Sequence, residues 1–360
     1  MSSSTTQDNR KQNMKITLIL WIVMVAAGMA AMLYVASNKT IVIADAAQEE
    51  FAGENDADSH AKEGTKLLFE NRGGEKRSIR IPLPKGTKAE NVVMENRYME
   101  RELWIYLQGA ESSFYRENAL YGDVQSVLQG YCEDNRDSIV LKLQMADVME
   151  YRSTMENDTL TIACSEPGEL YRFVVVIDPV GGGTDMGIVD EEYAEKNLAL
   201  KVAKQLQRTY EQEGVKLYFT RLEDVNVSEE ERLRLVEDVH ADAFIRIGGS
   251  CDDREENYGI QSFYNEEYFI PGFGNVQLAD ALTRNVTIAS SNRAEGLFPA
   301  GEDSILQKIT VPAAQICLGY LSNPQENVLL RREDYQEKLA EGLADAITEV
   351  YTQIADSASE

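Results

Sequence analysis

The sequence has few histidines and cysteines, the side chains that could hold a transition metal or take part in nucleophilic attack on a carbonyl group. The chain has only two histidines, His60 and His240, so a site with three histidine ligands is impossible. A cysteine nucleophile needs a nearby base, and neither histidine is well placed, because His60 falls in an acidic stretch and His240 ends a predicted surface helix. The cysteines show no CxxC spacing and are too sparse for a disulfide scaffold, so the sequence gives no pairing. The four are Cys132, Cys164, Cys251 and Cys317.

An apolar strand followed by a glycine-rich loop is the most distinctive short motif. Residues 173–177 form a continuous apolar run of the kind that is buried in a parallel sheet, and residues 178–183 follow as Asp-Pro-Val-Gly-Gly-Gly. Glu195 lies in the first turn of the next predicted helix, just before an apolar stripe. Because the helix dipole favours an acidic residue there, Glu195 has a structural explanation that needs no metal.

Strands alternate with helices from residue 171 onwards, which indicates an α/β sheet with helices on both faces. The strands after the first are predicted at residues 215–219, 243–247, 260–264 and 314–318. The helices are predicted at residues 191–212, 228–239, from about 276, and 333–353.

Over residues 174–351, the sequence resembles the zinc-dependent N-acetylmuramoyl-L-alanine amidases of the amidase_3 family. The glycine-rich loop corresponds to a loop with the sequence Asp-Pro-Gly-His-Gly-Gly in the family. Four further segments match the family's sequence in the same order along the chain. They are residues 195–200, 214–221 (a strand ending in Thr-Arg), 232–244, and 318–324, whose Leu-Gly-Tyr-Leu-Ser-Asn-Pro is close to the family's Leu-Gly-Phe-Leu-Ser-Asn-Pro. The resemblance implies the family's α/β fold in residues 171–356.

In that family, zinc is held by a histidine, a glutamate and a second histidine, and another glutamate acts in catalysis. The first histidine falls on Gly181, the second on Gly248, and the glutamate ligand on Glu195. The catalytic glutamate falls on Cys317. Since hydrolytic zinc needs three protein ligands and an open position for water, the resemblance implies a family member that has lost its zinc and its catalysis.

A rebuilt metal site is the alternative. Thiolates are good zinc ligands, and Cys251 follows the strand end at Gly248 closely enough to converge with Glu195 and Cys317. For Cys317 we favour another role, that of a small buried apolar residue that fills the vacated site.

The N-terminal part of the sequence predicts a membrane anchor. Residues 16–36 carry no formal charge and are long enough to span a bilayer, while residues 1–15 are basic near the span and the sequence beyond it is acidic. The basic flank places the N-terminus in the cytoplasm and the folded parts outside. A cleaved signal peptide is the competing reading, with Ala44-Asp45-Ala46 as its cleavage site.

Two further segments precede the amidase-like part. Residues 37–64 are small, polar and acidic and predict a flexible spacer. Short segments in which polar and apolar residues alternate recur across residues 65–166, and they predict a β-rich, sandwich-like domain. Its place and its Leu-Trp-Ile-Tyr-Leu strand at residues 103–107 resemble the AMIN module, which targets some wall amidases to peptidoglycan; a β-rich spacer or partner-binding module is the alternative.

These features together predict a membrane-anchored protein of the bacterial cell wall. A net charge of −26 argues against nucleic-acid binding. The expected partners are a peptidoglycan stem peptide or a wall-remodelling protein, bound by an inactive amidase-like domain that needs no cofactor. An active peptidoglycan amidase with a rearranged metal site is the second hypothesis, and a purely structural scaffold is the third.

Overall fold

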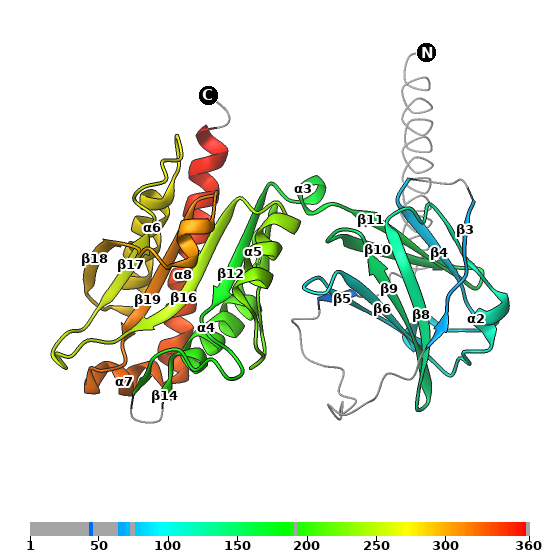
Figure 1. Cartoon of the computed structure of the whole chain (residues 1–360), viewed down its shortest axis with the longest axis horizontal. Coiled ribbons are helices and arrows are strands. Elements are labelled where there is room, and N and C mark those ends of the chain that lie inside the picture. Colours follow the sequence, from blue (N-terminus) through cyan, green and yellow to red (C-terminus); the bar gives the residue numbers. More distant parts are fainter. Residues whose placement is uncertain (1–42, 46–63, 73–75, 191–192, 358–360) are drawn as a thin grey trace, which may run out of the picture.

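The structure is a computed structural model that describes residues 43–45, 64–72, 76–190 and 193–357 (Figure 1). The predicted membrane span at residues 16–36 lies outside the described residues, as do the basic N-terminus and most of the spacer with His60. Within the described ranges, no helix is both long and apolar enough to cross a bilayer.

Two β-sheets with a common core make up the part of the chain before residue 166. One sheet has the order β1-β5-β6-β9-β8-β2 and the other β10-β11-β4-β7-β3. Apolar side chains of both sheets pack together, among them Ile105 of β6 and Leu160 of β11, which are fully buried. The arrangement is a small β-sandwich with one short helix, α2, and one 3-10 turn, η1; its likeness to the AMIN module stays a prediction. The bounds are β1 Ile43–Asp45, β2 Thr65–Lys66, β3 Phe69–Asn71, β4 Ser78–Pro82, η1 Ala89–Asn91, β5 Val92–Arg97, β6 Glu102–Gln108, α2 Phe114–Glu117, β7 Leu120–Gly122, β8 Val127–Asn135, β9 Ser138–Met145, β10 Glu150–Glu156 and β11 Thr159–Ser165.

A six-stranded sheet with helices on both faces forms the rest of the chain, as predicted (Figure 1). Its order is β15-β12-β16-β19-β17-β18. The first four strands in that order are parallel, whereas β17 runs antiparallel to β19 and β18 follows the direction of β17. The bounds are α3 Pro167–Leu170, β12 Phe173–Pro179, β13 Val189–Asp190, β14 Tyr193–Ala194, α4 Glu195–Thr209, β15 Val215–Phe219, α5 Glu229–Asp238, β16 Ala243–Ser250, β17 Ile260–Tyr264, α6 Asn275–Ser290, β18 Ala294–Pro299, η2 Ile305–Lys308, β19 Ala313–Tyr320, α7 Pro324–Leu330 and α8 Glu333–Ser357.

The edge strand β18 is the one element of the large sheet that the sequence reading did not identify. Its residues are exposed or only half-buried. Since β18 buries no continuous apolar face, it lacks the alternation that reveals a strand.

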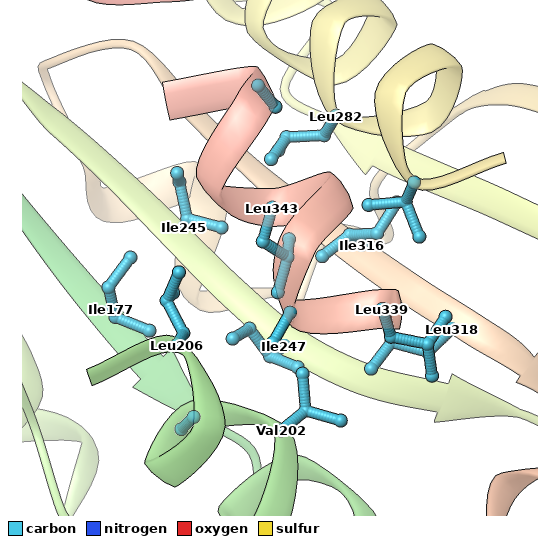
Figure 2. Packing of buried hydrophobic residues seen from close by; sticks show 14 of the residues in the cluster. Ile177, Val202, Leu206, Ile245, Ile247, Leu282, Ile316, Leu318, Leu339 and Leu343 are labelled. Atoms are coloured by element: carbon cyan, nitrogen blue, oxygen red, sulfur yellow. The ribbon is translucent and has the colours of Figure 1, made fainter. Parts of the chain in front are cut away.

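A continuous apolar core lies between one face of this sheet and the helices α4, α6 and α8. Figure 2 shows isoleucines of the central strands packed against leucines of these helices, for example Ile177 beside Leu206 of α4 and Ile247 near Leu343 of α8. Every residue of β12 is buried, which accounts for the continuous apolar run at residues 173–177. A smaller core on the other face involves α5 and η2.

The β-sandwich contacts the α/β part through the turn between β5 and β6. The Tyr98 hydroxyl donates to the carbonyl oxygen of Phe219 at 2.9 Å and accepts from its amide at 3.1 Å. Arg101 donates to both carboxylate oxygens of Asp238, from Nε at 2.7 Å and from Nη2 at 2.5 Å. Since Tyr98 and Phe219 are buried, these contacts fix the first part against the end of β15.

Candidate functional site

A row of side chains crosses the large sheet on the face opposite α4 and α8. In the strand register, Asp178 of β12 pairs with Arg246 of β16, Arg246 with Gln315 of β19, and Gln315 with Phe263 of β17. Because successive residues of a strand point to opposite faces, the isoleucines next to Asp178, Arg246 and Gln315 enter the core with α4 and α8 instead.

Asp178 is the centre of a buried cluster of arginines. Arg232 of α5 forms an ion pair with Asp178 Oδ1, and Arg246 Nη1 donates to Oδ2 at 2.7 Å. Thr220 adds a hydroxyl hydrogen bond to Oδ1 at 2.7 Å. Arg221 lies beside them and donates to backbone carbonyl groups; burial, and next the charge of Arg232, lower its pKa to about 10. The carboxylate of Asp178 is thus shared by Arg232 and Arg246, while the charges of Asp224 and Asp185 also act on Arg221.

The segment that follows β15 packs against the glycine-rich loop after β12. Gly181, Gly182 and Gly183 have φ of 70°, 126° and 56°, values that favour glycine. A Cβ atom at Gly182 would lie 2.2 Å from the carbonyl oxygen of Val225. Asp224 accepts from the Gly183 amide at 2.8 Å, so the loop is held from that side as well.

Glu195, to which the sequence resemblance assigns the family's glutamate ligand, is buried at the start of α4 with 4% of its surface exposed. Its Oε2 accepts from the amide of Ile188 at 2.9 Å, and its Oε1 accepts from the amide of Gly249 at 2.8 Å. Burial raises the pKa of this carboxyl, and the two backbone hydrogen bonds partly offset that rise. Both oxygens thus serve as acceptors for the backbone, which ties α4 to the end of β16.

At the two positions to which the resemblance assigns the family's histidines, an added Cβ atom would lie too close to neighbouring atoms as they now stand. A Cβ atom at Gly248 would lie 2.5 Å from Glu195 Oε1 and 3.1 Å from Val180 Cγ2. One at Gly181 would lie 2.7 Å from the carbonyl oxygen of Asp185, in a left-handed backbone conformation. The carboxylate and the loop backbone therefore occupy the space next to these glycines.

Cys317 and Cys251 lie in different environments. Cys317 is in register with Gly248 and is buried, and burial raises the pKa of its thiol to about 12. Its sulfur accepts a weak hydrogen bond from Gln315 Nε2 at 3.6 Å. Cys251 is exposed, and all four cysteines are free thiols. His240 is exposed at the end of α5, as its place in the sequence predicted.

These residues do not fit the zinc ion that the family uses. Hydrolytic zinc takes three protein ligands. Of the three positions that the resemblance assigns, only Glu195 has a side chain that can bind zinc, and each of its two carboxylate oxygens already accepts a hydrogen bond from a backbone amide. Among the residues that the structure describes, no three His, Cys, Asp or Glu side chains are close enough to hold a metal. The rebuilt site proposed at Glu195, Cys251 and Cys317 stays a prediction.

A cleft with a volume of about 510 Å³ lies beside these residues, and the sequence reading missed it. Arg246, Gln315 and Phe263 of the cross-strand row belong to its lining. The signal that would have found it is a charged residue within an otherwise apolar strand, because Arg246 interrupts the buried run of β16. The other lining residues are Asp185, Val227, Glu229, Arg232, Ala300, Gly301, Asp303, Ser304 and Ile305.

Residues 175–349 match the sequence model of the family described as N-acetylmuramoyl-L-alanine amidase (Amidase_3). The germination-specific N-acetylmuramoyl-L-alanine amidase of Bacillus subtilis (strain 168) is 28% identical over 199 residues, which covers 51% of this chain and 81% of that protein. The probable cell wall amidase LytH of Staphylococcus aureus is 28% identical over 186 residues, or 51% of this chain and 60% of its own length.

Solved amidase structures also resemble about half of the chain. The N-acetylmuramoyl-L-alanine amidase of Clostridium difficile 630 is 26% identical, with a TM-score of 0.47, and covers 50% of this chain and 97% of its own. The amidase AmiC2 of Nostoc punctiforme is 27% identical, with a TM-score of 0.46, and covers 50% and 98%. The family match confirms the resemblance that the sequence motifs indicated for this part of the chain.

Proposed function

From the premise that residues 175–349 form an amidase_3 domain, we propose that this chain is a membrane-anchored cell-wall protein that binds without hydrolysing. Its ligand is a peptidoglycan stem peptide or a wall-remodelling partner, and the muramoyl-L-alanine amide bond stays intact. The anchor is the apolar segment at residues 16–36, which places the folded parts outside the cytoplasm. From there the domain positions or regulates an active amidase.

The contact between Glu195 and the glycine at position 248 carries the proposal. In an active site of this family, the glutamate and a histidine at this position bind the same zinc ion. Here a Cβ atom at Gly248 would lie 2.5 Å from Glu195 Oε1, and the Gly249 amide donates to that same oxygen. With glycine at two of the three ligand positions, the described site is not expected to hold the zinc ion that acidifies water and polarises the amide carbonyl in the family.

The rest of the catalytic apparatus supports the same conclusion. Cys317 stands at the position of the catalytic glutamate, and its raised pKa keeps the thiol protonated at neutral pH. A protonated, buried thiol is a poor general base. The scaffold around the site is nevertheless complete and well packed, and an open cleft remains beside it. An open cleft beside a site that lacks two of the family's metal ligands favours binding over hydrolysis.

Hydrolysis of a purified muropeptide by the full chain in detergent tests the loss of catalysis. The reaction is run with added zinc and with a chelator, beside an active amidase_3 enzyme as the positive control. We expect no release of the stem peptide by a sample whose circular dichroism shows it folded. Release that the chelator abolishes would establish the alternative, an active amidase with a rearranged site, and Glu195, Cys251 and Cys317 would be the first residues to replace.

Binding is tested separately, by sedimentation with purified cell-wall sacculi and by pulldown with wall-remodelling proteins. Co-sedimentation with sacculi supports binding of the stem peptide, and capture of a protein without sacculus binding supports a scaffold. A folded chain that binds neither would refute the proposal.

A further inference from the structure

One end of the β-sandwich, which we call the joined end, is held against the α/β part by buried polar contacts. Besides the turn between β5 and β6, Glu150 of β10 takes part, and its Oε1 accepts from the Tyr218 hydroxyl of β15 at 2.6 Å. Lys216 of β15 forms an ion pair with the same oxygen at 3.1 Å. The rings of Tyr98 and Tyr218 meet edge to face, with centroids 5.1 Å apart. Because these contacts are hydrogen-bonded and mostly buried, they hold the two parts in one orientation.

The opposite end of the sandwich, which we call the free end, is made of the connections at the other ends of the same strands. Strand β5 begins there and β6 ends there, since Val92 pairs with Leu107. The seven residues of β6 separate the two ends by about 23 Å. The connections of the free end are residues 83–91, 109–113, 136–137 and 157–158.

The chain enters the sandwich from the free end. Residues 43–45, which the sequence assigned to a flexible spacer, form β1 and pair in parallel with residues 94–96 of β5. Because β5 runs from the free end to the joined end, β1 runs the same way and is reached from the free end. Only residues 37–42 separate β1 from the predicted membrane span at residues 16–36. The connection from Ala36 to Ile43 can therefore be no longer than about 25 Å.

We infer that the free end of the sandwich faces the lipid bilayer, and that the sandwich is a rigid stand that holds the α/β part away from it. The short connection keeps the free end near the membrane surface, and the sandwich adds its own length of about 23 Å before the α/β part begins. Exposed residues of the free end are polar or charged, among them Lys85, Glu111 and Asp137, so this end meets the headgroup layer and does not enter the hydrocarbon. The inference rests on the proposed function, because it takes residues 16–36 as the anchor.

Quenching of a fluorescent label by the membrane surface tests the inference. The full chain is reconstituted into vesicles of phosphatidylethanolamine and phosphatidylglycerol that carry a nickel-chelating lipid, a short-range quencher, in both leaflets. A maleimide dye is placed at the free end in Lys85→Cys/Cys251→Ser and in Asp137→Cys/Cys251→Ser, and in the α/β part at the exposed Cys251 of the unmodified chain. We expect quenching at both free-end sites to be at least about three times as strong as at Cys251, because the length of the sandwich lies between them.

Lengthening the connection gives a second measurement. An insertion of about twelve Gly and Ser residues between Asn38 and Lys39 adds a flexible segment with an average span of about 20 Å. We expect this insertion to lower the quenching at residue 85 by at least about half, because the free end is then no longer kept near the headgroups. The same insertion between Ser3 and Ser4, on the other side of the predicted span, is the matched control and should leave the quenching unchanged.

Equal quenching at residue 85 and at Cys251, stronger quenching at Cys251, or no effect of the insertion after Asn38 would each overturn the inference. Retention in the vesicles after carbonate extraction, measured on the same preparations, tests the anchor of the proposed function separately. A retained chain with equal quenching at the two sites would refute the inference and leave the proposed function standing. A chain that carbonate removes from the vesicles would refute both the anchor and the inference.

Discussion

Replacing Gly248 by alanine should destabilise the amidase-like domain, because the smallest side chain already collides with Glu195. The new Cβ atom would lie 2.5 Å from Oε1, well inside the contact distance of carbon and oxygen. To relieve the contact, the carboxylate must move away from the amide of Gly249, which now donates to it at 2.8 Å.

The expected cost has two sources. Extra volume in a packed core costs about 1–3 kcal/mol, and the loss of a hydrogen bond to a charged group costs about 1.5–3 kcal/mol. Since the same displacement causes both, the two costs overlap, and we expect a total of about 2–4 kcal/mol. For a domain of this size, that corresponds to a fall in melting temperature of about 5–15 °C.

Gly249→Ala supplies the control at the neighbouring position. The nearest atom to its Cβ would be Leu321 Cδ1 at 3.5 Å, an ordinary contact, so we expect a change in melting temperature of no more than a few degrees. Thermal unfolding followed by far-ultraviolet circular dichroism reports on both variants, because the helices lie mainly in this domain. The double variant Gly248→Ala/Glu195→Ala tests the cause, since removal of the carboxylate removes the collision.

Our reasoning would be wrong if Gly248→Ala and Gly249→Ala melted at the same temperature. It would also be wrong if the alanine at position 248 cost as much in the Glu195→Ala background as in the unmodified chain, because the destabilisation would then have another source.

Three further predictions follow from other contacts. Tyr98→Phe leaves the buried amide and carbonyl of Phe219 without their partner, so we expect a loss of about 1–3 kcal/mol and faster hydrogen exchange at the Phe219 amide. Maleimide should label one thiol per native chain at pH 7.5, at the exposed Cys251, and labelling should vanish in Cys251→Ser; fast labelling of a second thiol would contradict the burial of the other three. Burial raises the pKa of Glu326, so its contribution to stability is full below its ordinary value of 4.5 and declines as the pH rises. Glu326→Gln should therefore destabilise the domain more at pH 4 than at pH 7, and a cost that grows with pH would contradict this sign.

The sequence predicted the elements whose patterns are set by burial alone. Residues 173–177 of β12 are all apolar because both faces of the strand are covered, and α4 begins with an acidic residue before a regular apolar stripe. The helices α4, α5 and α8 begin within about four residues of the predicted starts, because each buries one regular apolar face. The assignment of the family's two histidine positions to Gly181 and Gly248 comes from the sequence resemblance and stays a prediction.

The cluster of arginines around Asp178 was not predictable in the same way. Arg221, Arg232 and Arg246 come from three different elements, and an arginine read alone is most often an exposed residue. Their convergence on Asp178 depends on the register between β12 and β16 and on the packing of α5, which no local pattern encodes. The sequence did favour a buried Cys317, and the structure confirms that burial. The exposure of Cys251 was not predicted, because this residue lies just beyond the end of its strand.

Zinc stoichiometry tests the central claim most directly. The purified full chain is dialysed to equilibrium against micromolar zinc, and the bound metal is measured by mass spectrometry beside an active amidase_3 enzyme. Our account predicts no stoichiometric zinc in this chain and one zinc per molecule in the active enzyme. One zinc per chain, lost on replacement of Glu195 by alanine, would contradict it.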